Sequence, residues 1–215
     1  MEQIKVIKHT DADTRCLENV VNYPIGKDQI LKAGFGVDPY NTKNAVMAFT
    51  RTAEFFGNEN KSKVFHYVIS FTNETAPTAE SAMGLAKEIL KPITDNHLAV
   101  VGVHNKDRDG GSYHVHAAVS PTNFRNGSML YCDNRTNYAL AQSVANVTGQ
   151  PSKLSVRYDV KSEKEAKEWS CGKIFIPVTE IEDMLADHDL LRETLQMVKC
   201  EDSDSLYEQI YGCAY

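Results

Sequence analysis

Apolar and polar positions alternate along the chain with two different periods. Residues 63–72, KVFHYVISFT, place large apolar side chains at every second position, which is typical of a half-buried strand. The same pattern or short apolar runs predict strands at residues 4–9, 30–37, 98–104, 113–120 and 173–178. Apolar residues recur every three or four positions at residues 14–22, 44–56, 78–91, 136–148 and 180–199, which predicts amphipathic helices.

The order of these elements predicts an α+β fold. We expect an antiparallel sheet with helices packed on one face and the other face available for a site. The composition changes near Pro151. Residues 1–132 hold 14 Lys and Arg against 14 Asp and Glu, whereas residues 133–215 hold 9 against 15. We therefore expect one domain over residues 1–150 and a mostly helical, acidic appendage over residues 151–215.

Length and composition exclude several classes of protein. The chain has 215 residues, of which 42% are hydrophobic, as in an ordinary globular protein. No apolar run approaches the length of a membrane span, and the N-terminal residues lack the apolar core of a signal peptide, so we expect a cytoplasmic protein. The five cysteines are scattered without a C-x-x-C pair, so neither a disulfide framework nor a zinc knuckle is indicated. The net charge is −6, and residues 1–132 are neutral, which does not resemble the dense basic stripe of a tight, non-specific DNA-binding protein; a local basic face is still compatible with this balance.

Three histidines gather around one predicted hairpin. Because successive side chains of a strand point to opposite faces, His114 and His116 share one face. Pairing of residues 98–104 with residues 113–120 brings His104 beside them. Three imidazoles on paired strands can bind a divalent ion and leave coordination positions open, as a catalytic site requires. The plainer interpretation is a hairpin with surface histidines and an acidic turn.

A Tyr-Pro pair follows the first predicted helix. Pro24 cannot continue a helix and favours an extended residue before it, so Tyr23 is expected at the helix end, with its hydroxyl projecting beyond the element. Without other context, a tyrosine at such a position is most often a half-buried packing residue.

Four blocks of the chain resemble the mobilisation relaxases, members of the HUH endonuclease superfamily. These blocks are ENVVNYPIGKDQILKAGFGVD, FHYVISF, LAVVGVHNKD and HVHAAVSPTNFRNG. The resemblance covers residues 17–127, a little over half of the chain. It implies an HUH-relaxase-like sandwich, similar to a ferredoxin or palm fold.

The resemblance also implies roles for individual residues. Tyr23 matches the nucleophile at the end of the family's first helix, and His104, His114 and His116 match the ligands of its divalent metal, for which Mg²⁺ or Mn²⁺ is expected. His66 lies where many members have a histidine, in the strand that precedes the helix predicted at residues 78–91. A second interpretation of His66 is a core histidine whose hydrogen bonds are satisfied.

The chain departs from the family pattern in one loop. The family commonly has H-x-D-x-x-H-x-H, whereas NKDRDGGSY separates His104 from His114 here. Asp107 and Asp109 are both candidates for the acidic position, and both are also typical of solvated turns beside glycine.

Four further residues are candidates for contact with DNA. Lys27, Lys32 and Arg125 could bind phosphates, and Asn123 matches a polar position that the family often has after the H-x-H strand. Single exposed bases also simply keep a surface soluble.

The leading functional hypothesis is metal-dependent nicking of one DNA strand by tyrosine transesterification at the transfer origin of a plasmid or conjugative element. The expected partners are single-stranded or extruded origin DNA and accessory mobilisation proteins. The alternatives are a rolling-circle replication initiator of the same superfamily, a relaxase-like domain that binds DNA or a partner without catalysis, and a small metal-dependent hydrolase unrelated to DNA.

Overall fold

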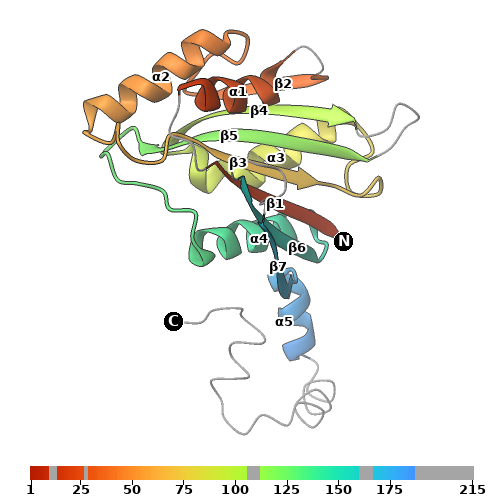
Figure 1. Cartoon of the computed structure of the whole chain (residues 1–215). Coiled ribbons are helices and arrows are strands. Elements are labelled where there is room, and N and C mark those ends of the chain that lie inside the picture. Colours follow the sequence, from red (N-terminus) through yellow and green to blue (C-terminus); the bar gives the residue numbers. More distant parts are fainter. Residues whose placement is uncertain (10–13, 27–28, 106–111, 160–166, 187–215) are drawn as a thin grey trace, which may run out of the picture.

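A seven-stranded sheet runs through the part of the chain that the structure, a computed structural model, describes: residues 1–9, 14–26, 29–105, 112–159 and 167–186 (Figure 1). The strands are β1 (Glu2–His9), β2 (Leu31–Phe35), β3 (Phe65–Ser70), β4 (His97–Asn105), β5 (Tyr113–Asn123), β6 (Ser152–Asp159) and β7 (Lys167–Phe175). Their spatial order is β2-β4-β5-β3-β1-β6-β7, and neighbours are antiparallel except β1 and β6. The α+β class is as predicted.

Helices α3 (Ala79–Thr94) and α4 (Asn134–Thr148) cover one face of the sheet. The main core lies beneath them. Across five strands one buried row of directly opposed residues consists of Val101, Ala117, Tyr67, Val6 and Val156. Helix α3 begins with a capping box, in which the side chains of Thr78 and Ser81 each accept a hydrogen bond from the other's backbone N–H. Two N–H groups that have no partner within the helix are thereby hydrogen-bonded.

Helices α1 (Thr14–Ile25) and α2 (Thr42–Phe55) lie on the opposite face, over β4 and β5 (Figure 1). Their apolar side chains form a second core with the strand residues that face them, for example Val21 with Val100 and Ala118. The expectation of helices on one face only is therefore wrong. The reason is visible in LAVVGV, because a strand buried on both faces is continuously apolar rather than alternating.

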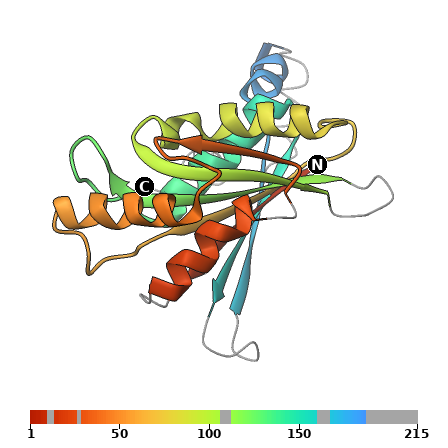
Figure 2. The same cartoon turned by 90° about the horizontal axis from the view of Figure 1, so that it is seen from above.

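The C-terminal part of the described chain continues the same sheet. Strand β6 pairs in parallel with β1, β7 pairs with β6, and the short helix α5 (Val178–Ala186) follows. The strand order places β6 and β7 at the edge of the sheet opposite β2, and Figure 2 shows these two strands, in teal and blue, crossing the rest of the sheet at a steep angle. The expectation that residues 151–215 are mostly helical is wrong for these residues. Leu154 and Val156 are buried between more exposed neighbours, a period of two that predicts a strand.

Candidate active site

Strands β4 and β5 bring the three predicted metal ligands together. His104 lies directly opposite His114, and His116 lies opposite Gly102. Directly opposed residues share a face, so all three imidazoles project to the face that carries α1 and α2. His116 is buried, and His104 and His114 are half-buried. The pairing that the sequence predicts for this hairpin is confirmed.

The end of α1 approaches the sheet at Gly102. A Cβ atom at Gly102 would lie 1.6 Å from the carbonyl oxygen of Pro24, so only glycine allows this packing. The side chain of Gln29 donates a hydrogen bond of 2.9 Å to the carbonyl oxygen of Tyr23. The helix continues to Ile25, with Pro24 in its last turn, whereas the sequence predicted an end at residue 22. Tyr23 nevertheless lies at the C-terminal end of the helix, next to the histidine-bearing strands.

The ring of Tyr23 contacts the histidine cluster. Its centre is 4.7 Å from the ring centre of His116, 5.3 Å from that of His104 and 5.6 Å from that of His66. The side chain of Tyr23 is 50% exposed, so one side of the phenol remains open to solvent. Residues far apart in the sequence therefore form one site around an accessible tyrosine.

His66 and His116 form a buried pair beneath Tyr23. Nε2 of His66 and Nδ1 of His116 are 3.0 Å apart, a hydrogen bond in which one ring donates and the other accepts. Burial is the main cause that lowers the pKa of His66 to about 3 and that of His116 to about 2, and the neighbouring histidines lower both further. Both rings are therefore neutral at physiological pH.

A pocket of about 340 Å³ opens beside Tyr23, His66 and His116. It is also lined by His9 of β1 and Arg157 of β6, two residues that the sequence analysis missed. His9 stacks on His66 with ring centres 5.8 Å apart. The ladder places Arg157 opposite Ile7, which in turn is opposite His66. The sequence signal for either residue is weak, because it depends on knowing that β1 lies between β3 and β6.

The histidine cluster has some of the properties of a metal site. The centre of an imidazole ring lies roughly 3.2 Å from an ion bound to its nitrogen, so two rings on one ion are at most about 6.5 Å apart. The three pairs among His104, His114 and His116 are 4.4, 5.6 and 6.2 Å apart. However, no group of three or more His, Cys, Asp or Glu side chains within the described ranges is arranged to hold a metal ion. The donor chemistry and the distances between the ring centres therefore suit a divalent ion, although the three side chains as they stand do not form such a group.

The predicted DNA-contacting residues do not all reach this site. Lys32 of β2 lies opposite Gly102, in the same row of the sheet as His116. Asn123 lies at the other end of β5, seven residues and about 23 Å along the strand from His116. Its side-chain oxygen accepts hydrogen bonds from the backbone N–H groups of Arg125 and Asn126, which indicates a role in the turn.

Three other candidate site residues lie outside the described residues: Lys27, Asp107 and Asp109. Asp107 and Asp109 therefore both stay candidates for the acidic position, as the sequence predicts.

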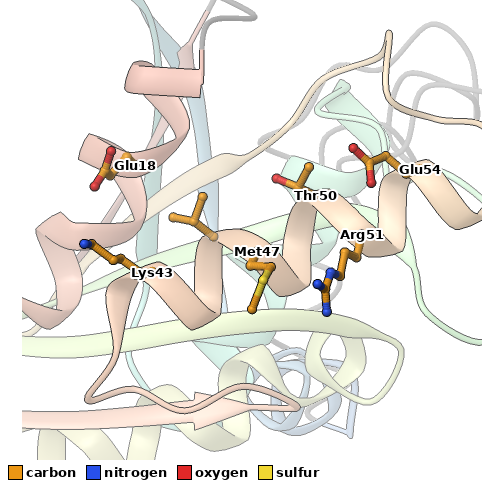
Figure 3. A pocket seen from close by; sticks show the side chains of 7 residues that line it. Glu18, Lys43, Met47, Thr50, Arg51 and Glu54 are labelled. Carbon is orange, nitrogen blue, oxygen red and sulfur yellow. The ribbon is translucent and has the colours of Figure 1, made fainter.

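A second pocket, of about 520 Å³, opens on the outer side of α1 and α2 (Figure 3). Its cations, Lys43 and Arg51, are matched by the carboxylates of Glu18 and Glu54. It shares no lining residue with the pocket beside Tyr23. This second pocket therefore does not extend the tyrosine–histidine site.

These features define a class of protein: an α+β domain whose sheet presents an accessible tyrosine beside a cluster of neutral histidines, in a pocket that also contains an arginine. The family model of relaxases, described as the MobA/VirD2-like nuclease domain, matches residues 24–149, more than half of the chain. The chain belongs to this relaxase family, which implies DNA nicking in mobilisation. No curated protein matches the chain.

The family match includes His66, His104, His114 and His116 but not His9, and it begins one residue after Tyr23. The position of Tyr23 is thus supported by the ring contacts rather than by the match. Among the described residues, no helix combines the length and the apolar character needed to cross a membrane.

Proposed function

We propose that this chain is a relaxase that nicks one strand of DNA through covalent attack by Tyr23. The observation that carries the proposal is the contact of the Tyr23 ring with His66, His104 and His116, residues delivered by three different strands. A tyrosine held beside imidazoles, yet half exposed, suits a nucleophile that must meet a large substrate.

The proposed reaction is a transesterification. The phenolic oxygen of Tyr23 attacks a backbone phosphorus, an O–P bond forms, and the bond from phosphorus to the 3′-oxygen breaks. The products are a 5′-phosphotyrosine link and a free 3′-hydroxyl, with the phenolic proton passed to a base and a proton supplied to the 3′-oxygen. Because a phenol ionises only near pH 10 in water, the attack needs such a base. His66, Asp107 and Asp109 remain the candidates.

Charge neutralisation is the second requirement of the reaction, because the oxygens of a phosphodiester repel a nucleophile. Arg157 lines the pocket and brings a permanent positive charge to the side of Tyr23 that faces β1 and β6. We propose that His104, His114 and His116 hold a divalent ion, Mg²⁺ or Mn²⁺. Such an ion, when bound, supplies Lewis-acid stabilisation of the phosphoryl oxygens.

The proposed substrate is single-stranded or extruded DNA at a transfer origin of a plasmid or conjugative element, with accessory mobilisation proteins as further partners. A cytoplasmic location is part of the proposal, because the DNA substrate lies there. Lys32 of β2 is a second proposed phosphate contact, in the same row of the sheet as His116. It lies toward the β2 edge of the sheet, whereas Arg157 lies toward the β7 edge.

The test uses labelled single-stranded oligonucleotides tiled across the DNA that flanks the gene for this chain. Each is incubated with the protein and Mn²⁺ or Mg²⁺, and covalent adducts are resolved on a denaturing gel. We expect an adduct with one group of overlapping oligonucleotides, its loss in Tyr23→Phe, and its retention in Tyr40→Phe, a control tyrosine that is 79% exposed and outside the pocket. An adduct that persists in Tyr23→Phe would refute the assignment.

A second candidate is a relaxase-like domain that binds DNA without cutting it. The observation that favours this candidate is that no described group of three ligand side chains is arranged for a metal ion. Binding of the oligonucleotides without any adduct, with either metal ion, would support it over nicking.

A further inference from the structure

A third pocket, of about 620 Å³, lies at the end of the sheet where β1 ends and β3 begins. It is larger than the pocket beside Tyr23. Lys8 and Lys61 contribute positive charge to its wall, and Tyr131 contributes aromatic surface, whereas Phe65 at its base is buried. Tyr131 is 63% exposed, so its ring is largely uncovered. The pocket thus combines cations with an open aromatic ring.

This pocket adjoins the candidate active site at one residue. His9 lines both pockets. His9 stacks on His66 at 5.8 Å between ring centres, and His66 lies 5.6 Å from the ring of Tyr23. Two ring contacts therefore separate the proposed nucleophile from the wall of the third pocket. A DNA strand whose phosphate lies at Tyr23 has to extend by only a few nucleotides to enter it.

The chemistry of the lining suits a nucleotide in single-stranded form. Unpaired bases stack on exposed aromatic rings without requiring a particular sequence, and lysine ammonium groups bind the flanking phosphates. The ammonium group of Lys61 is held at 2.7 Å from the side-chain oxygen of Asn58, which fixes its position at the rim. Asn58 is itself buried and donates to the carbonyl oxygen of Gly127.

One acidic residue also lines the pocket. Asp133 accepts a hydrogen bond of 2.9 Å from the backbone N–H of Thr136 as the N-cap of α4, so this carboxylate is directed to the helix. The lining residues thus include two lysines and one carboxylate, and this carboxylate already accepts a hydrogen bond from the helix. Their net charge is positive, which is complementary to a phosphate backbone.

We propose that this pocket, bounded by Lys8, Lys61, Phe65 and Tyr131, binds one or two nucleotides of single-stranded DNA next to the nick site. The proposal rests on the proposed function, because the DNA strand is taken to be the substrate of Tyr23. In it, Tyr131 is a stacking platform and Lys61 a phosphate contact.

The experiment measures binding of a labelled, random-sequence single-stranded 20-mer by fluorescence anisotropy at several salt concentrations. Tyr131→Ala is expected to weaken binding by about 5-fold to 150-fold, the loss of one stacked base, whereas Tyr131→Phe keeps near-normal affinity. Lys61→Ala is expected to reduce the salt dependence by about 0.7 in slope, one phosphate contact. The matched controls are Tyr40→Ala and Lys87→Ala, exposed residues that line neither pocket. Thermal unfolding checks that every variant is folded.

Covalent adduct formation by Tyr23 is followed in parallel, so that the two proposals are judged separately. Wild-type affinity in both Tyr131→Ala and Lys61→Ala, together with a normal Tyr23 adduct, would overturn the nucleotide pocket and leave the nicking function intact. Absence of both DNA binding and adduct in the wild-type chain would overturn both. Weakened binding in Tyr131→Ala that Tyr131→Phe restores supports the pocket.

Discussion

Replacing Gly102 by alanine is expected to displace the nucleophile without touching it. The new Cβ atom would lie 1.6 Å from the carbonyl oxygen of Pro24 and 2.6 Å from its carbonyl carbon. Because backbone atoms cannot rotate away as a flexible side chain does, the end of α1 must move by about 1.5 Å or more to reach an ordinary contact distance. Tyr23 immediately precedes Pro24 and moves with it.

The expected effect on chemistry is larger than the effect on stability. Overpacking by one methyl group typically costs about 1–3 kcal/mol in the free energy of unfolding. A displacement of about 1 Å at a reacting group lowers a rate by about 100-fold, so adduct formation in Gly102→Ala should slow by at least about that factor. Affinity for single-stranded DNA should change less than the rate of adduct formation, because neither Gly102 nor Pro24 lines the third pocket, where the flanking nucleotides are proposed to bind.

The assay compares single-turnover rates of adduct formation, urea unfolding and oligonucleotide binding for Gly102→Ala and Gly84→Ala. Gly84 is the matched control, since a Cβ atom there meets nothing within 4 Å and the residue lies in α3 on the other side of the sheet. A folded Gly102→Ala protein that forms the adduct at the wild-type rate would refute the idea that this close approach positions Tyr23.

Three further outcomes are expected. Glu2 is completely buried and accepts hydrogen bonds from the backbone N–H of Thr72 and from two threonine hydroxyls. Glu2→Ala leaves these donors without their acceptor, so it should lower the free energy of unfolding, measured by urea titration, by about 3 kcal/mol. A change near zero would contradict this. Burial lowers the pKa of His97 below its ordinary 6.5, so the unfolded chain binds more protons than the folded chain at acidic pH. The free energy of unfolding should therefore fall as the pH drops below about 6.5, by up to about 1.4 kcal/mol per pH unit, and it should fall more steeply in the wild type than in His97→Asn. Equal pH slopes of the free energy of unfolding in the two proteins would contradict this. Mn²⁺ binding measured by calorimetry should weaken at least about 10-fold in His114→Ala, and unchanged binding would remove this residue from the proposed ligand set.

The central hairpin of the site could be predicted from the sequence alone. The H-x-H spacing places His114 and His116 on one face by strand geometry, and the loop after residue 104 implies that His104 pairs with the same strand; the register confirms both. The elements that lie around this hairpin were also predicted closely, because their apolar periods are clear.

Other features depend on the order of strands, which local patterns do not encode. His9 and Arg157 join the site only because β1 pairs with β3 on one side and with β6 on the other. The role of Gly102 depends on where α1 crosses β4. Asn123 matched a family position in sequence, yet the length of β5 separates it from His116. The placing of His9, Arg157 and Gly102 is set by packing between segments more than fifty residues apart in the sequence.

Mass spectrometry of the covalent product tests directly whether Tyr23 is the nucleophile. The protein is incubated with the oligonucleotide that forms an adduct, then digested with nuclease and protease, and the nucleotide-bearing peptide is sequenced. We expect a nucleotide joined to Tyr23 through its 5′-phosphate, and no such modification in Gly102→Ala at short reaction times. A nucleotide attached to another tyrosine, or to a serine or histidine, would contradict it.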